Sequence, residues 1–432
     1  MTLNTYNEQS AQQHELNGAR RAWISRLVER LIPDRSCCTA YLEVCHAILK
    51  DFRKHIIDSD EHTGYTLLLV WIHNDNSSRW IQYALSAKQG IDLVPLVVLM
   101  LDIGKTCKAL VESDRARYDS VSQEGWTWLG RHLNQICTLW LGTHIAVARR
   151  SLALAGAILR YHKHPDAIQT TLTSLVTYIR ALHQHMTRIQ LYSLFEPERT
   201  EFFYSNSSGD NNDNDEDEQL TVDRECLKQA TQIFFTAIAA LADVTPNNSP
   251  NYDTLKGCLQ ELVDYITFFC QETEDILDIL FELHGNNDED AVNLQLDILN
   301  LYEKLTSLSS AQGNAQGLHN DIKHILDTAG ISPNRLFLFF CQRTGMDHSL
   351  LVDLLLSNET EFLLFFVQYL KYVERNPEIF VYACNDFVAE DHPKEEVTDM
   401  LRGVMAVLQS GGFPYNPTYL INRLTNVLKL LE

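Results

Sequence analysis

Two pairs of histidines have a spacing that could chelate a metal ion: His162 with His164, and His183 with His185. On a β-strand, residues i and i+2 share a face, whereas on a helix they diverge by about 200°, so that one ion cannot bind both. The second pair lies in "SLVTYIRALHQHMTRIQL", which has helical spacing. The first lies in "RYHKHPD" at an expected helix end, where His and Lys favour the carbonyl terminus. We therefore expect no metal site at either pair.

An acidic segment, "YSNSSGDNNDNDEDEQ" at residues 204–219, has the Asp and Asn spacing of the first positions of an EF-hand calcium loop. Such a loop also needs Gly at position six and a bidentate Glu at position twelve. A loop that starts at Asp210 or at Asp213 has neither. Because the segment also has no apolar residue to bury after Tyr204, we expect an acidic, disordered linker or loop at 204–220 and no calcium site.

Motifs for nucleophilic, phosphate-binding and zinc-protease chemistry are absent from the sequence, among them G-x-G-x-x-G, G-x-x-x-x-G-K-[ST], G-x-S-x-G and H-E-x-x-H. Carboxylates are plentiful, but nothing in the sequence pairs two of them for acid–base catalysis. We therefore expect no catalytic residue, no cofactor and no small-molecule substrate. An enzyme with an unrecognised site remains an alternative.

Charge is distributed unevenly along the chain, whose formal net charge is −22. Residues 1–200 carry 22 Lys and Arg against 19 Asp and Glu, whereas residues 201–432 carry 13 against 38. Nucleic-acid backbones attract clustered Lys and Arg, so the acidic half should repel them. One basic group could form a face for an acidic partner or nucleic acid, or a solvated helix rim: Arg149, Arg150, Arg160, His162 and Lys163. We expect proteins as partners, and no direct contact with nucleic acid.

The composition is typical of a folded intracellular protein, with 45% apolar and 21% charged residues in a chain of 432. The polar start predicts no signal peptide, and ten Cys without a C-x-x-C pair predict reduced, mostly buried thiols. The longest apolar run, Leu93–Leu101, is far below the roughly 20 residues that a membrane span needs.

Helical spacing dominates the apolar pattern. One long 4-3 alternation has apolar flanks that are too wide for a two-stranded coiled coil, namely Leu255, Leu259, Leu262, Ile266, Phe269, Ile276, Leu280 and Leu283. Pro377, Pro393 and Pro417 mark helix starts, and Gly411 with Gly412 ends a helix over Pro393–Ser410. We therefore predict an all-α protein, an irregular armadillo- or HEAT-like helical array (α-solenoid), with helical regions at 1–203 and 221–432.

The segment "SNETEFLLFFVQYLKYVERN" is unusually apolar, and helical spacing explains it. In a helix over Glu359–Arg375 capped by Asn358, four polar residues fall within an arc of about 80°: Glu361, Gln368, Lys371 and Arg375. Leu364 is the apolar exception inside that arc, and nearly all of the remaining surface is apolar. We predict an inner helix of a helical core, enclosed except for this polar stripe.

Two segments of the chain's last part resemble the carboxyl-terminal part of the Lines protein family, over residues 346–432. The first is "ETEFLLFFVQYLKYV", with Glu359, Thr360, Phe362, Leu363, Phe366, Tyr369, Leu370 and Lys371 as matching residues. The second is "FPYNPTYLINRLTNVLKLLE", with Phe413, Pro414, Tyr415, Asn416, Leu420, Arg423 and Leu424.

The resemblance implies a non-enzymatic regulator of developmental, Wnt-type signalling and of transcription. The founding member of the family is a fly segment-polarity protein that acts in the nucleus and cytoplasm through zinc-finger transcriptional regulators. The expected partners are therefore proteins such as transcriptional regulators, and the expected location is the cytoplasm and nucleus. A helical adaptor in an unrelated pathway remains the alternative.

The terminal segment "GGFPYNPTYLINRLTNVLKLLE" offers candidate partner-binding residues: Tyr415, Tyr419 and Arg423, residue types that anchor protein interfaces. Tyr419 and Arg423 are four apart and share a helix face, whereas Leu420, Leu424 and Leu428 lie on the adjoining face and should pack inward. A purely structural cap at the end of the array is the alternative.

Overall fold

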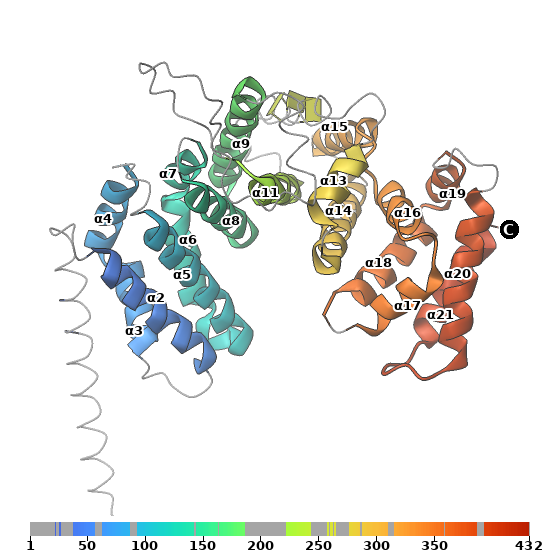
Figure 1. The fold of residues 1–432 in the computed structure, drawn as a ribbon, viewed down its shortest axis with the longest axis horizontal. Coiled ribbons are helices and arrows are strands. Elements are labelled where there is room, and N and C mark those ends of the chain that lie inside the picture. The colour runs from blue at the N-terminus through green and yellow to red at the C-terminus, as the bar shows by residue number, and fades with distance from the viewer. Residues whose placement is uncertain are drawn as a thin grey trace, which may run out of the picture. The chain divides into compact units, whose positions relative to one another are not determined.

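The computed structural model describes residues 38–56, 63–86, 93–141, 144–162, 164–185, 222–242, 276–285, 287–309, 315–357, 359–386 and 393–431, and single residues at 22, 26 and between 257 and 264. All regular structure in these ranges is helical, as the all-α prediction requires (Figure 1). No helix in the described ranges is long and apolar enough to cross a membrane.

The contacts divide the chain into two compact units, with the boundary inside α11 (Arg224–Ala242) between Ile233 and Phe234. The helices that precede this boundary belong to unit 1: α2 (Cys38–Lys54), α3 (Thr63–His73), α4 (Asp75–Ser86), α5 (Leu93–Ser113), α6 (Arg115–Arg131), α7 (Leu133–Cys137), the short 3-10 helix η2 (Thr138–Trp140), α8 (Ile145–Tyr161) and α9 (Pro165–His185). The linker predicted at 204–220 lies outside the described residues, and the division into 1–203 and 221–432 stays a prediction.

Helix α5 is the centre of unit 1 and packs against α2, α6 and α8. The first half of its sequence, "LVPLVVLMLDIGKTCKALVES", is apolar on nearly every side and has to be covered, whereas Lys105, Lys108 and Glu112 in the second half are exposed. Glycines let α6 approach closely: a Cβ on Gly125 would lie 2.4 Å from the Cys107 sulfur, and one on Gly104 would lie 2.8 Å from the Trp126 ring. A side chain at either position would force the two helices apart.

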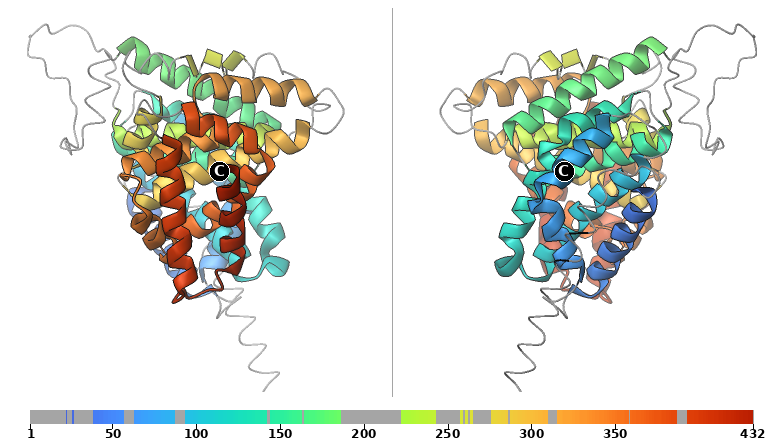
Figure 2. Two further views of the ribbon diagram at one scale, coloured as in Figure 1. Left: turned by 90° about the vertical axis from the view of Figure 1, so that its right-hand side faces the viewer. Right: turned by 90° about the vertical axis from the view of Figure 1, so that its left-hand side faces the viewer.

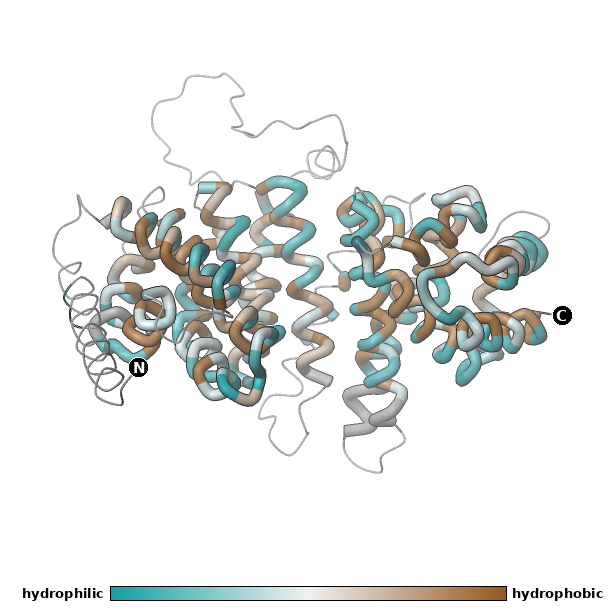
Figure 3. The backbone as a smooth tube through the Cα atoms, turned by 90° about the horizontal axis from the view of Figure 1, so that it is seen from below, coloured by the Kyte–Doolittle hydropathy of each residue, from teal (hydrophilic) through white to brown (hydrophobic). Residues whose placement is uncertain are grey.

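Unit 2 contains the remaining helices: α13 (Ile276–His284), α14 (Asp288–Ser309), α15 (Ala315–Thr328), α16 (Pro333–Arg343), α17 (His348–Leu356), α18 (Phe362–Arg375), α19 (Pro377–Asp386), α20 (Pro393–Ser410) and α21 (Thr418–Leu431). Polar and apolar residues alternate along these helices (Figure 3). Helix α18 packs against α14, α17, α19 and α21, and α20 lies beside α21 (Figure 2). The finer description of this array as an armadillo- or HEAT-like solenoid stays a prediction.

Helix boundaries in unit 2 follow the predicted Pro and Gly signals. Helices α19 and α20 begin at Pro377 and Pro393, and α20 ends at Ser410. Gly411 and Gly412 follow with φ angles of 82° and 94°, which a residue with a side chain rarely adopts. Helix α21 begins one residue after Pro417.

Helix α18 begins at Phe362, three residues later than the predicted start at Glu359. Ser357 ends α17 and its Oγ accepts a hydrogen bond from the Glu359 amide at 3.1 Å, so these residues belong to the connection between the helices. Glu361 is consequently the N-cap residue and not the third helical residue. Asn358, the predicted cap, lies outside the described residues.

The predicted enclosure of α18 is confirmed. Its buried residues are Phe362, Phe365, Phe366, Tyr369, Leu370, Tyr372 and Val373. Leu364 is 47% exposed, and Glu361 and Arg375 are also exposed, whereas Gln368 and Lys371 are half-buried, so the predicted polar stripe is open to solvent only in part. The aromatic rings continue into α16, where Phe337 lies 4.4 Å from Tyr369 between ring centroids.

Only part of the long apolar pattern that starts at Leu255 is described. Helix α13 is its last section, and Ile276, Leu280 and Leu283 are buried there at the predicted spacing. Leu277 and Phe281 are buried as well, which confirms the wide apolar band for this section.

The described cysteines are free thiols, and all but Cys258 are buried, as expected.

Truncating Phe366 should destabilise unit 2 strongly, because this ring is fully buried. We expect Phe366→Ala to lower the free energy of unfolding by about 3–5 kcal/mol, and Leu364→Ala on the same helix to lower it by about 0.5 kcal/mol or less. Urea unfolding followed by circular dichroism measures both. All six tryptophans belong to unit 1, so their fluorescence serves as an internal reference. Equal losses in the two variants would contradict the enclosure of α18.

His132, between α6 and α7, should make the stability of unit 1 depend on pH. Its side chain is buried, and neither ring nitrogen has a hydrogen-bond partner among the described residues. Burial, together with the charge of Arg131, lowers its pKa from 6.5 to about 4. Between these values the unfolded chain binds a proton that the folded chain excludes, so stability should fall by about 3 kcal/mol as the pH drops from 6.5 to 4.

The measurement is urea unfolding at several pH values, followed by tryptophan fluorescence. His132→Phe should flatten the pH dependence in this window, whereas His324→Phe, at an exposed position of α15 in unit 2, should leave it unchanged. An identical pH profile for His132→Phe and the unmodified chain would show that His132 is not the group responsible.

Candidate partner-binding surface

Lys371 of the polar stripe of α18 and the neighbouring Glu374 contact α21. Lys371 lies beside Tyr419, and Glu374 further along α18 contacts Arg423 and Asn426 further along α21. The two helices therefore run in the same direction. We call the strip that they form together the α18–α21 surface. Its exposed residues are Leu364, Tyr419, Asn422, Asn426 and Lys429, and its half-buried residues are Gln368, Lys371, Glu374 and Arg423.

Tyr419 is the aromatic residue of this surface and is 46% exposed. Its hydroxyl accepts hydrogen bonds from Nη2 and Nε of Arg423, at 2.8 and 3.1 Å. The Lys371 ammonium lies 5.7 Å from its ring centroid, within the range of a cation–π contact. The ring is thus held at its hydroxyl and at its face while remaining open to solvent.

Arg423 also joins the two helices. Its Nη1 forms an ion pair with Glu374, and Asn426 donates to the other carboxylate oxygen of Glu374 at 3.0 Å. The Glu374 side chain is 17% exposed, so this pair is partly shielded from water. Arg423 therefore has a structural role as well as the predicted position on the partner-binding face, and Tyr419 is the better probe of binding.

The structure brings together two of the three predicted partner-binding residues, Tyr419 and Arg423. Tyr415 lies in the loop before α21, half-buried, with its ring 5.6 Å from that of Phe413. Burial raises the pKa of Tyr415. Leu420, Leu424 and Leu428 are buried, as predicted for the inward face of α21.

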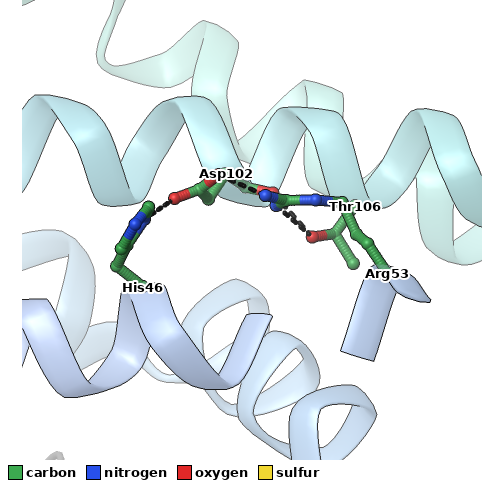
Figure 4. Close-up of polar contacts among 4 residues, drawn as sticks. All are labelled: His46, Arg53, Asp102 and Thr106. Atoms are coloured by element: carbon green, nitrogen blue, oxygen red, sulfur yellow. Dashed lines mark hydrogen bonds and ion pairs between the residues drawn. The ribbon is translucent and has the colours of Figure 1, made fainter. Parts of the chain in front are cut away.

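A second polar cluster lies in unit 1 between α2 and α5 (Figure 4). The buried carboxylate of Asp102 pairs with Arg53 at 2.7 Å and contacts Nδ1 of His46. Arg53 also donates to the Asp102 carbonyl at 3.1 Å and to the Thr106 hydroxyl at 3.3 Å. An Asp–His pair can orient an imidazole for acid–base catalysis, but here Arg53 neutralises the carboxylate and joins it to the other helix.

Sequence reasoning missed the Asp102 cluster, although two signals for it exist. Asp102 directly follows the apolar run Leu93–Leu101, so it is a carboxylate in a helix that must be buried. His46 and Arg53 are seven residues apart and therefore share a helix face. Their 49- to 56-residue separation from Asp102 is what hides the pairing in the sequence.

The histidine pairs lie where α8 and α9 end, whereas Arg149 and Arg150 of the basic group lie in the first half of α8, and Lys163 lies outside the described residues. The rings of His162 and His164 stack at 5.8 Å between centroids, and burial together with His164 lowers the pKa of His162. Across the described ranges, no three His, Cys, Asp or Glu residues are placed to hold a metal ion. Arg149 of the basic group forms an ion pair with Asp223, so its charge is partly neutralised.

Removing Arg53 should destabilise unit 1, because the buried charge of Asp102 would keep a single partner among the described residues, His46. We expect Arg53→Met to lower the free energy of unfolding by about 3–5 kcal/mol. Lys108→Met is the matched control on α5, since Lys108 pairs with Glu112 at the exposed surface, and should cost about 0.5 kcal/mol or less. Urea unfolding followed by tryptophan fluorescence compares them. A small loss for Arg53→Met would show that the cluster does not hold α2 to α5.

Comparison with known proteins places this arrangement in a family. Protein Lines homolog 1 of Homo sapiens is 33% identical over 105 residues, which are 24% of this chain and 14% of the human protein. The homologue of Mus musculus is 32% identical over 107 residues, 24% of this chain and 13% of that protein. Protein lines of Drosophila melanogaster is 44% identical over 59 residues, 14% of this chain and 7% of the fly protein. The chain thus spans only a small part of the length of the relatives it matches.

The family model that matches is described as Lines N-terminus, and it covers residues 144–384, more than half of the chain. The first of the two resembling segments, at 359–371, lies within this range, although the resemblance suggested the carboxyl-terminal part of the family. The second segment, from Phe413 onward, lies beyond it. The chain belongs to the Lines family.

Proposed function

We propose that this chain is a non-enzymatic helical scaffold that binds a protein partner through the α18–α21 surface. The observation that supports this most directly is Tyr419, which is exposed and yet held by Arg423 and Lys371. Tyrosine and arginine are enriched among the residues that dominate binding energy. A ring whose position is already fixed loses less conformational entropy when a partner covers it.

The second support is the rigid base beneath this surface. Lys371 and Glu374 project from α18, whose aromatic side chains are buried. Rotation of this helix would expose Phe366 or Tyr369, so the side chains of the stripe keep their direction. Positioning on a packed helix suits recognition better than positioning on a loop.

The pathway part of the proposal rests on membership of the Lines family. We propose that the chain regulates developmental, Wnt-type signalling and transcription, in the cytoplasm and nucleus, and that transcriptional regulators are among its partners. Its binding role and its pathway can be tested separately, because one concerns a surface and the other a cellular response.

Replacing Tyr419 should weaken partner binding and leave the fold intact. We expect Tyr419→Ala to reduce the affinity for the partner about 10- to 30-fold, the effect of losing a dominant interface residue. Quantitative affinity capture with the full chain, beside thermal melting and a Wnt-responsive transcription reporter, measures the effect.

Tyr382→Ala is the matched control, because Tyr382 is 68% exposed on α19 of the same unit. It should bind as the unmodified chain does. Unchanged capture by a normally melting Tyr419→Ala variant would contradict the proposal, as would an equal loss in both variants. A loss of capture without any change in the reporter would contradict only the pathway.

A further inference from the structure

The α18–α21 surface is basic within an acidic unit. Residues 234–432 contain 11 Lys and Arg against 29 Asp and Glu. Helices α18 and α21 contain four of the basic residues and a single acidic one, Glu374. The rest of this range therefore has 7 basic and 28 acidic residues, and its basic residues include Arg335 and Arg343 of α16, of which Arg343 pairs with Asp278. Helices α18 and α21 thus repel a negatively charged ligand less than unit 2 as a whole does.

Two of the four basic residues are already neutralised. Arg423 pairs with Glu374, and Arg375 lies 3.4 Å from Glu303. Lys371 and Lys429 form no ion pair with any residue in the described ranges. Lys371 rests against the ring of Tyr419 instead, and a cation–π contact leaves its N–H groups able to donate to a carboxylate.

The distance from Leu364 to Lys429 sets the length of a ligand that could contact both residues. Lys429 is ten residues beyond Tyr419, about 15 Å along α21, and Leu364 is seven residues before Lys371, about 10 Å along α18. Because the two helices run in the same direction and Lys371 lies beside Tyr419, Leu364 and Lys429 lie at opposite ends of the α18–α21 surface. A strip of about 25 Å accommodates about eight residues of extended chain.

We propose that the α18–α21 surface binds a short acidic segment of a partner protein, with an apolar side chain near Leu364 and carboxylates at Lys371 and Lys429. This inference rests on the proposed function and adds the chemistry of the partner. Opposite charges on the two surfaces favour correct encounters and reject basic partners. Nucleic acid fits less well, because a long polyanion would meet the acidic remainder of unit 2 and only two unpaired lysines.

Two labelled pools of 15-residue peptides test the proposal with the full chain. One pool is randomised among Glu, Asp, Leu, Phe and Ser, and the other has Lys and Arg in place of Glu and Asp. The acidic pool should be enriched on the protein, and the enrichment should fall as salt concentration rises. The basic pool should not be enriched.

Lys371→Glu should weaken binding of the enriched acidic peptides at least tenfold, and Tyr419→Ala should weaken it as well. Lys323→Glu on α15 of the same unit makes the same charge change away from this surface, and it should have no effect. Lys371→Gln, which removes the charge without reversing it, provides a second variant if Lys371→Glu does not fold.

Several outcomes would overturn the inference: no enrichment of the acidic pool, equal effects of the Lys371 and Lys323 variants, or tighter binding of a 20-base-pair DNA duplex through Lys371. If partner capture still depends on Tyr419 in these cases, the proposed binding function stands and only the acidic chemistry is wrong. If Tyr419→Ala leaves capture unchanged, the proposed function fails with it.

Discussion

Burial of the aromatic side chains of α18 is the interaction on which unit 2 depends. Phe362, Phe365, Phe366 and Tyr369 are enclosed by helices that lie before and after α18 in the chain. Aromatic side chains of this kind bury 150–250 Å² each, about 4–6 kcal/mol of transfer free energy per ring. The rings reach α16 through Phe337 and α19 through Phe380, so three helices share one aromatic core.

The same burial explains why the side of α18 that carries Lys371 and Glu374 can serve as a binding surface. A helix with an apolar arc this wide has one orientation that hides its rings, and that orientation fixes where Lys371 and Glu374 project. Helix α21 packs against α18 with Leu420 and Leu424 buried, and the Glu374–Arg423 pair joins the two helices. The exposed Tyr419 is therefore positioned by contacts that also stabilise the fold.

Local signals made much of this fold predictable from the sequence. The limits of α20 follow from Pro393 and Gly411, because each residue restricts or permits the conformation of its own backbone. The enclosed arc of α18 follows from the spacing of its aromatic residues. The pairing of Arg423 with Glu374 was not predictable, because 49 residues separate them and their meeting depends on how α18 and α21 pack. The later start of α18 has a local cause: the Ser357 hydroxyl accepts a hydrogen bond from the Glu359 amide, and the residues up to Glu361 form the connection from α17 instead of the first turn of α18.

The most direct test of the central role of α18 is native-state hydrogen exchange of unit 2, resolved along the chain by mass spectrometry. If α18 is the enclosed helix on which its neighbours depend, its amides between Phe366 and Val373 should exchange only through global unfolding of the unit, at the free energy that denaturant unfolding gives. Amides of α21 should exchange through a smaller opening that leaves α18 protected. Exchange of α18 before α21, or through local fluctuations, would contradict the account.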